Sequence, residues 1–190
     1  MHTKPLILAS SSPRRKLLLE QARLTFTIDT STYKEDLSYS TDPFELVKFL
    51  SRKKAEDVAT RHPNSIILGA DTIIVWNGEI MGKPHTDEKA REMLSKLNNA
   101  SHQVITGFTI INTETNKSIS DAVSSTVYFK KLTRKQIEDY IVTGEPLDKA
   151  GAYAIQEGAK DFVERVEGDY DNVVGLPIKN VLVILDEFAI

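Results

Sequence analysis

The feature that most constrains the fold of this chain is a strand that runs into a helix near its start. Residues 5–9 are apolar enough for a short buried strand, and the apolar positions of residues 17–22 repeat with the period of a helix. Ser12 followed by Pro13 predicts the helix N-terminus, because a serine hydroxyl caps free amides and proline lacks an amide that would be unbonded there.

The turn between this strand and helix gathers hydroxyls and cations. Residues 10–12 are all serine, and Arg14, Arg15 and Lys16 follow them in the first helical turn. Cations at a helix N-terminus oppose the helix dipole, whereas free amides there attract anions. The segment therefore predicts a bound anion, above all a phosphate; the alternative is a capped helix with a solvated basic first turn.

Strands and helices alternate along the rest of the chain. The patterns predict strands at 25–29, 65–76, 79–81, 103–112 and 118–129, and helices at 42–60, 86–97, 133–142 and 175–187. Asn77-Gly78 and the polar turn 113–117 predict two hairpins, while 153–166 is ambiguous between strand and loop. This order predicts an α/β fold with a mixed sheet, in a single domain spanning residues 1–190.

Composition excludes several classes of protein. The net charge of −3 argues against a general nucleic-acid binder, and the absence of cysteine excludes disulfides and thiolate chemistry. We expect no membrane partner, because no segment approaches the roughly 20 apolar residues of a span. The apolar run near the N-terminus is too short for a signal peptide, so a cytoplasmic protein is expected. The four histidines show no metal spacing and are interpreted as structural or surface residues.

Asp71 is the clearest catalytic candidate. It interrupts the nearly continuous apolar run 66–75, where a carboxylate needs a partner or a metal ion. Gly69 and Ala70 leave space beside it for a ligand or another backbone. A general base or metal ligand is the favoured interpretation; the alternative is an acid at a bulge, satisfied by local amides. An aspartyl-phosphate mechanism is disfavoured, because Ile73 stands where Asp-x-Asp would need a second aspartate.

Other polar residues are individually weak candidates. Lys83 lies in Gly-Lys-Pro, which is not a P-loop, and Lys54 is the residue of its basic run that could turn inward. Gln156 offers a donor and an acceptor, as reading a base edge requires, and Glu35 stands in a polar loop. Cations for phosphates, one or two carboxylates and no soft ligand are the inventory for Mg²⁺- or Mn²⁺-assisted attack of water on a phosphoryl group.

Several segments together resemble the Maf family of nucleoside triphosphate pyrophosphatases. The matching segments, in order along nearly the whole chain, are Leu-Ala-Ser-x-Ser-Pro-Arg-Arg at 8–15, Glu35, Lys54, Gly-Ala-Asp-Thr at 69–72, Gly-Lys-Pro at 82–84, Leu-Asp-Lys-Ala-Gly-Ala-Tyr at 147–153, Gln156 and Val-Val-Gly-Leu-Pro at 173–177. Within the family, Arg14, Thr72 and Gln156 resemble the branch that prefers dTTP and UTP.

The resemblance implies hydrolysis of a nucleoside triphosphate to the monophosphate and pyrophosphate, with a divalent cation such as Mg²⁺ or Mn²⁺. It implies an α/β fold with a bent mixed sheet flanked by helices, two lobes with a cleft between them as in the Maf and ITPase-like folds, and commonly a homodimer. By the same resemblance, Asp71 is the base and, with Glu35, a metal ligand. The implied substrate-binding residues are Ser10, Arg14, Arg15, Lys54, Thr72, Lys83 and Gln156.

Two alternatives stay open at this point. One is a related pyrophosphatase acting on ITP or XTP, and the other is a non-catalytic nucleotide-binding regulator of cell division. The sequence leaves undecided whether the physiological substrate is a canonical nucleotide or a modified pyrimidine nucleotide removed as a house-cleaning function.

Overall fold

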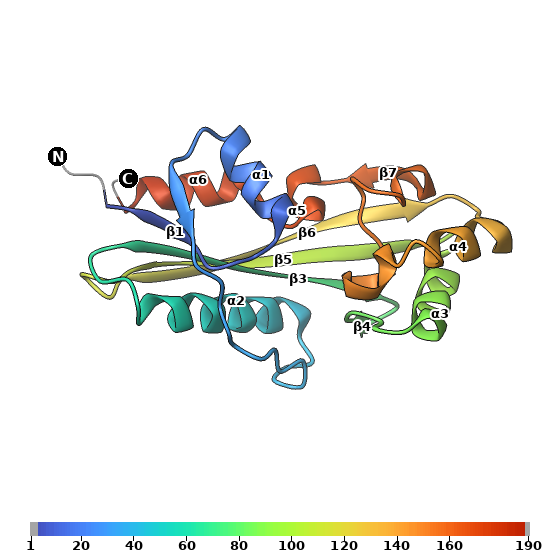
Figure 1. The fold of residues 1–190 in the computed structure, drawn as a ribbon, viewed down its shortest axis with the longest axis horizontal. Helices are drawn as coiled ribbons and strands as arrows, with labels where there is room; N and C mark the ends of the chain where they lie inside the picture. Colours follow the sequence, from blue (N-terminus) through green and yellow to red (C-terminus); the bar gives the residue numbers. More distant parts are fainter. Residues whose placement is uncertain (1–3, 189–190) are drawn as a thin grey trace. The chain divides into compact units, whose positions relative to one another are not determined.

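The computed structural model describes residues 4–188 and interleaves strands with helices (Figure 1). Its strands are β1 Leu6–Leu8, β2 Phe26–Ile28, β3 Ile66–Trp76, β4 Glu79–Met81, β5 Ser101–Asn112, β6 Ser118–Phe129 and β7 Val163–Glu167. Its α-helices are α1 Pro13–Gln21, α2 Pro43–Ala59, α3 Asp87–Leu97, α4 Arg134–Ile141, α5 Tyr170–Val174 and α6 Ile178–Asp186, and three 3-10 turns are η1 Glu145–Asp148, η2 Ala150–Ala152 and η3 Lys160–Phe162. His2 lies outside the described residues.

The strands of the described residues form one mixed sheet, which confirms the predicted fold class. The order is β2-β1-β3-β5-β6-β7, and β4 pairs with β3. Strand β1 pairs in parallel with β2 and β3, whereas β3–β4 and β6–β7 are antiparallel. The parallel part follows from helices α1 and α2, which provide the crossovers between consecutive strands.

Helices α1 to α4 begin where the sequence predicts them, because polar side chains satisfy their first amides, whereas α6 begins at Ile178, three residues after the predicted start, and has no side-chain cap. The Ser12 hydroxyl accepts from the amide of Arg15 at the start of α1, and Asp42 accepts from the amide of Phe44 at the start of α2. Thr86 and Thr133 cap α3 and α4 in the same way.

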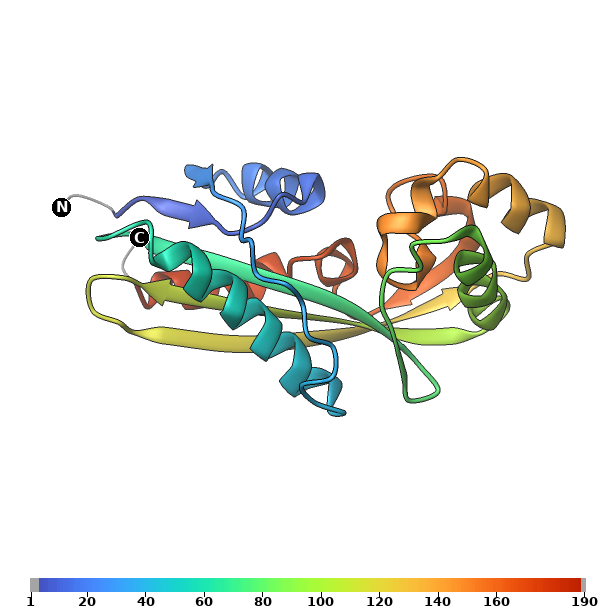
Figure 2. The ribbon, with the colours of Figure 1, turned by 60° about the horizontal axis from the view of Figure 1, so that its bottom comes forward.

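Two glycines let α2 lie directly on the sheet. A Cβ on Gly69 of β3 would stand 2.4 Å from the carbonyl oxygen of Ser51, and one on Gly107 of β5 would stand 2.4 Å from the carbonyl carbon of Val47. Real Cβ atoms do not approach so closely, so both strands need glycine here. Figure 2 shows α2 running along these strands.

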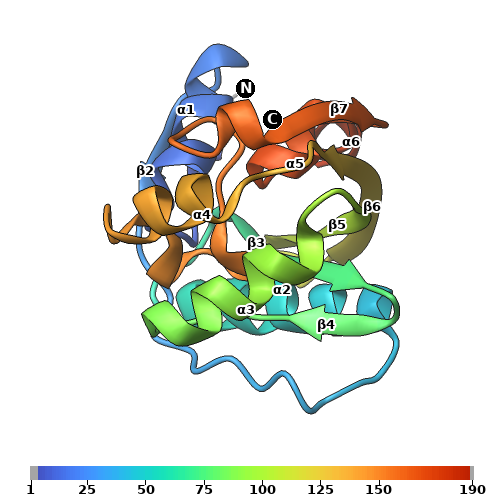
Figure 3. The ribbon, with the colours of Figure 1, turned by 90° about the vertical axis from the view of Figure 1, so that its right-hand side faces the viewer.

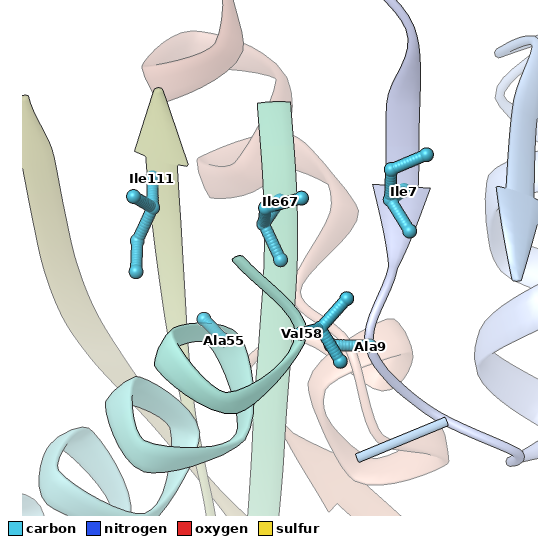
Figure 4. Packing of buried hydrophobic residues seen from close by; sticks show 6 residues of the cluster. All are labelled: Ile7, Ala9, Ala55, Val58, Ile67 and Ile111. Atoms are coloured by element: carbon cyan, nitrogen blue, oxygen red, sulfur yellow. The ribbon is translucent and has the colours of Figure 1, made fainter. Parts of the chain in front are cut away.

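The contact between α2 and the sheet is apolar around one cluster. Ala55 and Val58 of the helix pack on Ile7, Ile67 and Ile111 of three strands (Figure 4). Nearby, the buried Ser51 hydroxyl lies 2.8 Å from that of Thr109. Helices α1 and α6 lie on the side of the sheet opposite α2 (Figure 1).

The chain divides into two compact units. Among the described residues, the first unit holds 4–71, 106–123 and 175–188, and the second holds 72–105 and 124–174. Strands β3, β5 and β6 each contribute residues to both units. The single domain, the bend of the sheet and the cleft stay predictions.

The second unit has an aromatic interior. Phe129 lies edge-on to Tyr153, His102 and Phe162, with the ring centroids of Phe129 and Tyr153 4.8 Å apart. Helices α3 and α4 lie side by side (Figure 3). Arg91 of α3 forms a bidentate pair with Glu138 of α4.

The sequence patterns missed some elements of this second unit. The ambiguous segment 153–166 contains η3 and most of β7, and the short helix α5 precedes the predicted last helix. These pieces are too short for a clear period, so hydrophobic spacing does not reveal them. The two predicted hairpins are present, since β4 follows β3 after Asn77-Gly78 and the amide of Asn112 donates to the carbonyl of Lys117 across the other turn.

Candidate active site

The sheet register places the first polar turn beside Asp71. Leu8 of β1 pairs with Leu68 of β3, and the amide of Ala9 donates to the carbonyl of Leu68 at 2.8 Å. Ser10 therefore follows the end of β1 at the level where β3 reaches Asp71. Parallel α/β sheets commonly bind ligands at such carboxyl ends of strands.

The turn itself is built from hydrogen bonds to serine. The buried Ser10 hydroxyl accepts from the amide of Ser12 and from Nη1 of Arg15, each at 3.2 Å. Arg15 also donates through Nε to the carbonyl of Gly175 at 2.8 Å. The guanidinium of Arg15 is thus oriented by two anchors from distant parts of the first unit.

Asp71 and Glu35 meet at the ammonium group of Lys54. Asp71 is 5% exposed, and its carboxylate receives a hydrogen bond from Lys54. The same ammonium donates to Glu35 at 2.7 Å. Lys54 reaches inward from α2, as its helical position predicted, because the glycine contacts hold that helix on β3.

Electrostatics link these groups into one site, which we call the charged cluster: Ser10, Arg14, Arg15, Glu35, Lys54 and Asp71. Burial raises the pKa of Asp71, and Lys54 opposes this rise while Glu35 adds to it. Burial lowers the pKa of Arg15, with Asp71 raising it and Arg14 lowering it. Arg15 still carries its charge, since guanidinium groups do not deprotonate in proteins. Asp71 is consequently a carboxylate with raised basicity among cations.

The carboxylates fit a hard divalent cation. Glu35 and Asp71 face a shared cation, the Lys54 ammonium, and offer oxygen ligands of the kind that Mg²⁺ and Mn²⁺ prefer. No group of three or more histidine or acidic residues suited to a metal occurs within residues 4–188. Mg²⁺ is often held by one or two carboxylates together with substrate phosphates, so this donor set suits it.

The remaining predicted residues belong to the second unit. Lys83 is exposed in the loop after β4, where the amides of His85 and Gly151 donate to the carbonyls of Leu147 and Gly82. These bonds fasten the Lys83 loop to the segment that leads to Gln156. Thr72 is partly exposed and Gln156 is exposed. That these three residues join the charged cluster in binding substrate stays a prediction.

Sequence reasoning missed one member of the site's framework. The carbonyl of Gly175 holds Arg15, although 160 residues separate them. Any residue type can supply a backbone carbonyl acceptor, so the sequence does not reveal this contact, although Gly175 belongs to the Val-Val-Gly-Leu-Pro segment at 173–177. Among the described histidines, His62 contacts Asp29 and His102 is buried against Tyr153.

The fold and the site define an α/β protein with clustered cations around a buried carboxylate. The chain belongs to the Maf-like protein family, whose model matches residues 5–188. Its relatives include proteins named dTTP/UTP pyrophosphatase from Halalkalibacterium halodurans, 48% identical over 94% of this chain and 93% of the relative, and from a Geobacillus species, 47% identical over 94% and 95%. A third, from Geotalea uraniireducens, is 48% identical over 93% and 91%.

The chain is also similar to the solved structure of a nucleoside-triphosphatase, dITP/XTP pyrophosphatase, from Mycobacterium abscessus, with 12% identity over 67% of this chain and 75% of that chain and a TM-score of 0.40. This likeness is too slight to bear on activity. Among the described residues, no helix has the length and apolar character needed to cross a membrane.

Proposed function

We propose that this chain hydrolyses dTTP and UTP to the monophosphate and pyrophosphate. The observation that carries the proposal is Asp71, a buried carboxylate with raised pKa that contacts Lys54 within a cluster of cations. The name shared by relatives at 47–48% identity supports the pyrimidine substrates.

The cations have a defined task in this reaction. Arg14 and Arg15 neutralise the triphosphate and the charge that grows on the departing pyrophosphate. They therefore stabilise the transition state more than the ground state, which lowers the barrier. Because Ser10 and Gly175 orient Arg15 before substrate arrives, little reorganisation is needed. Lys83 contributes a further charge from the second unit in this proposal.

Asp71 accepts the proton of the attacking water. The water oxygen forms the new bond to phosphorus, the bond that breaks lies between the α and β phosphoryl groups, and pyrophosphate leaves with that electron pair. A raised pKa makes the ionised Asp71 a better base near neutral pH. Mg²⁺ or Mn²⁺, held by Glu35 and Asp71, supplies charge neutralisation and a lowered pKa for water.

In this proposal, residues of the second unit recognise the nucleobase of the substrate. Gln156 presents both a donor and an acceptor, which match the edge of uracil or thymine, and Thr72 follows the catalytic carboxylate. We also propose that the protein is a homodimer and that it is located in the cytoplasm. Light scattering of the purified chain measures the oligomeric state.

The test is pyrophosphate release with Mg²⁺ and with Mn²⁺ across canonical and modified nucleoside triphosphates. Selective release from dTTP and UTP, abolished by a chelator, is the expected result. Activity on ITP or XTP alone would replace the pyrimidine assignment, and orthophosphate as first product would place the broken bond elsewhere. Nucleotide binding without turnover would favour the regulator.

A further inference from the structure

The loop that carries Glu35 is fastened to α2 before it reaches Lys54. We call residues 29–35 the strap. Oδ2 of Asp57 accepts hydrogen bonds from the amide of Thr32 at 2.7 Å and from the Ser31 hydroxyl at 2.9 Å. The amide of Tyr33 donates to the same serine hydroxyl at 3.1 Å. One carboxylate on the helix therefore organises three successive residues of the strap.

Arg61, which itself pairs with Asp57 at 3.6 Å, holds the start of the strap. Arg61 donates through Nε and Nη2 to the two carboxylate oxygens of Asp29 at 2.9 and 3.1 Å, and Nε2 of His62 lies 2.7 Å from Asp29. Arg61 also donates to the carbonyl of Thr30 at 3.3 Å. The strap thus leaves β2 already attached to the C-terminal end of α2.

The spacing of these contacts constrains Glu35. Asp57 and Lys54 are three residues apart on α2, so they lie on one face about one turn from each other. Thr32, bonded to Asp57, is three residues from Glu35, a span of at most about 10 Å. Anchoring Thr32 at Asp57 consequently confines Glu35 to the neighbourhood of Lys54.

The two carboxylates of the charged cluster differ in how they are placed. Asp71 stands on β3 and is fixed by strand pairing, whereas Glu35 stands on an irregular loop with its side chain 34% exposed. A loop needs added contacts to hold a side chain in one geometry, because backbone freedom favours many positions. Asp57 supplies contacts of this kind and lies outside the charged cluster.

We propose that Asp57 is a positioning residue that holds the strap so that Glu35 faces Asp71 across Lys54. This role rests on the proposed function, in which Glu35 and Asp71 together bind the divalent cation. Asp57 acts through Glu35 and touches neither substrate nor metal. The hydrogen bonds from the strap lower the pKa of Asp57, which therefore stays ionised at neutral pH.

Three variants separate this role from a general effect on the helix. Asp57→Ala removes the anchor, and Asp57→Asn keeps a carbonyl oxygen that accepts from Thr32 and Ser31. Glu56→Ala is the matched control, since Glu56 is the neighbouring acid on α2 and pairs with the partly exposed Lys53 instead of the strap. All three changes fall at exposed or partly exposed positions of one helix.

Three readouts follow each variant. Hydrogen exchange measures protection of the Thr32 and Tyr33 amides, and calorimetry measures Mn²⁺ binding with a non-hydrolysable α,β-methylene analogue of dTTP. Steady-state kinetics separate kcat from KM. For Asp57→Ala we expect lost protection of both amides and a loss of about 10–100-fold in Mn²⁺ affinity and kcat, with KM near wild type. Asp57→Asn restores most of each, and Glu56→Ala changes none.

The outcomes also separate the two proposals. If wild-type protein releases no pyrophosphate but Asp57→Ala frees the strap and weakens Mn²⁺ binding, the proposed function falls and the positioning role stands. If wild-type protein is active and Asp57→Ala matches Glu56→Ala in Mn²⁺ affinity and kcat, the positioning role is overturned, whether or not the strap amides change.

Discussion

The two units of this chain bury polar groups in opposite ways. The first buries charge, since Asp71 is 5% exposed and contacts the ammonium of Lys54, with Arg15 close enough to influence its pKa. The second buries a neutral polar pair, in which Nε2 of His102, 3% exposed, lies 2.7 Å from the Tyr153 hydroxyl among aromatic rings.

This contrast distinguishes a site suited to reaction, the charged cluster, from a structural core, the aromatic interior. A buried carboxylate is stable only with partners, and those partners also tune its basicity and leave it able to take up a proton. In the second unit, burial lowers the pKa of His102 to about 4 and raises that of Tyr153, so both stay uncharged at neutral pH. The aromatic interior therefore supports a fold, while the charged cluster is equipped for reaction.

The largest expected effect tests the reactive side of this comparison. Asp71→Asn removes the proton acceptor but keeps the size of the side chain, so turnover should fall by about 10²–10⁴-fold while nucleotide binding persists. Pyrophosphate release and calorimetric binding measure the two properties. Asp139→Asn, at an exposed position of α4, is the control. Turnover of Asp71→Asn equal to wild type would remove Asp71 from the mechanism.

The supporting side should be sensitive to acid. The pKa of His102 is about 4 in the folded state and 6.5 when the side chain is exposed. Between about pH 4 and pH 6.5, His102 is therefore protonated in the unfolded chain and neutral in the folded chain. Stability at pH 7 is therefore lost as pH falls from about 6.5 towards 4, by about 3 kcal/mol. Urea unfolding of the wild type and of His102→Gln, which cannot titrate there, measures the difference. Parallel pH dependences of the two proteins would show that His102 does not titrate as described.

An intermediate effect concerns how the first unit is assembled. Gly69→Ala places a Cβ 2.4 Å from the carbonyl oxygen of Ser51, so α2 must shift at a cost of about 1–3 kcal/mol in stability. Because Lys54 moves with α2, kcat should fall as well. Thermal unfolding and kinetics test this, with Ser118→Ala at an exposed position of β6 as control. Unchanged stability and kcat would mean that the helix contact tolerates the methyl group.

The smallest expected effect sharpens the separation of roles. Thr133→Ala removes the capping box of α4 in the second unit, which should lower the free energy of unfolding by about 1 kcal/mol. Pyrophosphate release at a temperature where the variant is folded should stay at the wild-type rate. A fall in kcat beyond the loss of folded protein would show that α4 also contributes to the reaction.

Much of the fold could be predicted from local pattern. The capped starts of α1 and α2, the long β3 and the hairpin at Asn77-Gly78 all follow from neighbouring residues, because capping, periodicity and turn geometry are local effects. The short pieces between residues 145 and 174 could not be predicted, since their shape depends on packing against distant segments.

The candidate site divides in the same way. Sequence by itself determined which residues are candidates for the chemistry. An isolated acid in an apolar strand, cations at a helix start and a lysine on the inner side of a helix each need a partner of opposite charge or a ligand. Tertiary structure alone decided the pairing of Lys54 with Asp71 and Glu35, the anchoring of Arg15 on Gly175, and the fastening of the strap to Asp57. Those contacts join residues 17 to 160 positions apart, and only the packing of α2 on β3 and the register of β1 with β3 bring such distant groups within hydrogen-bonding distance.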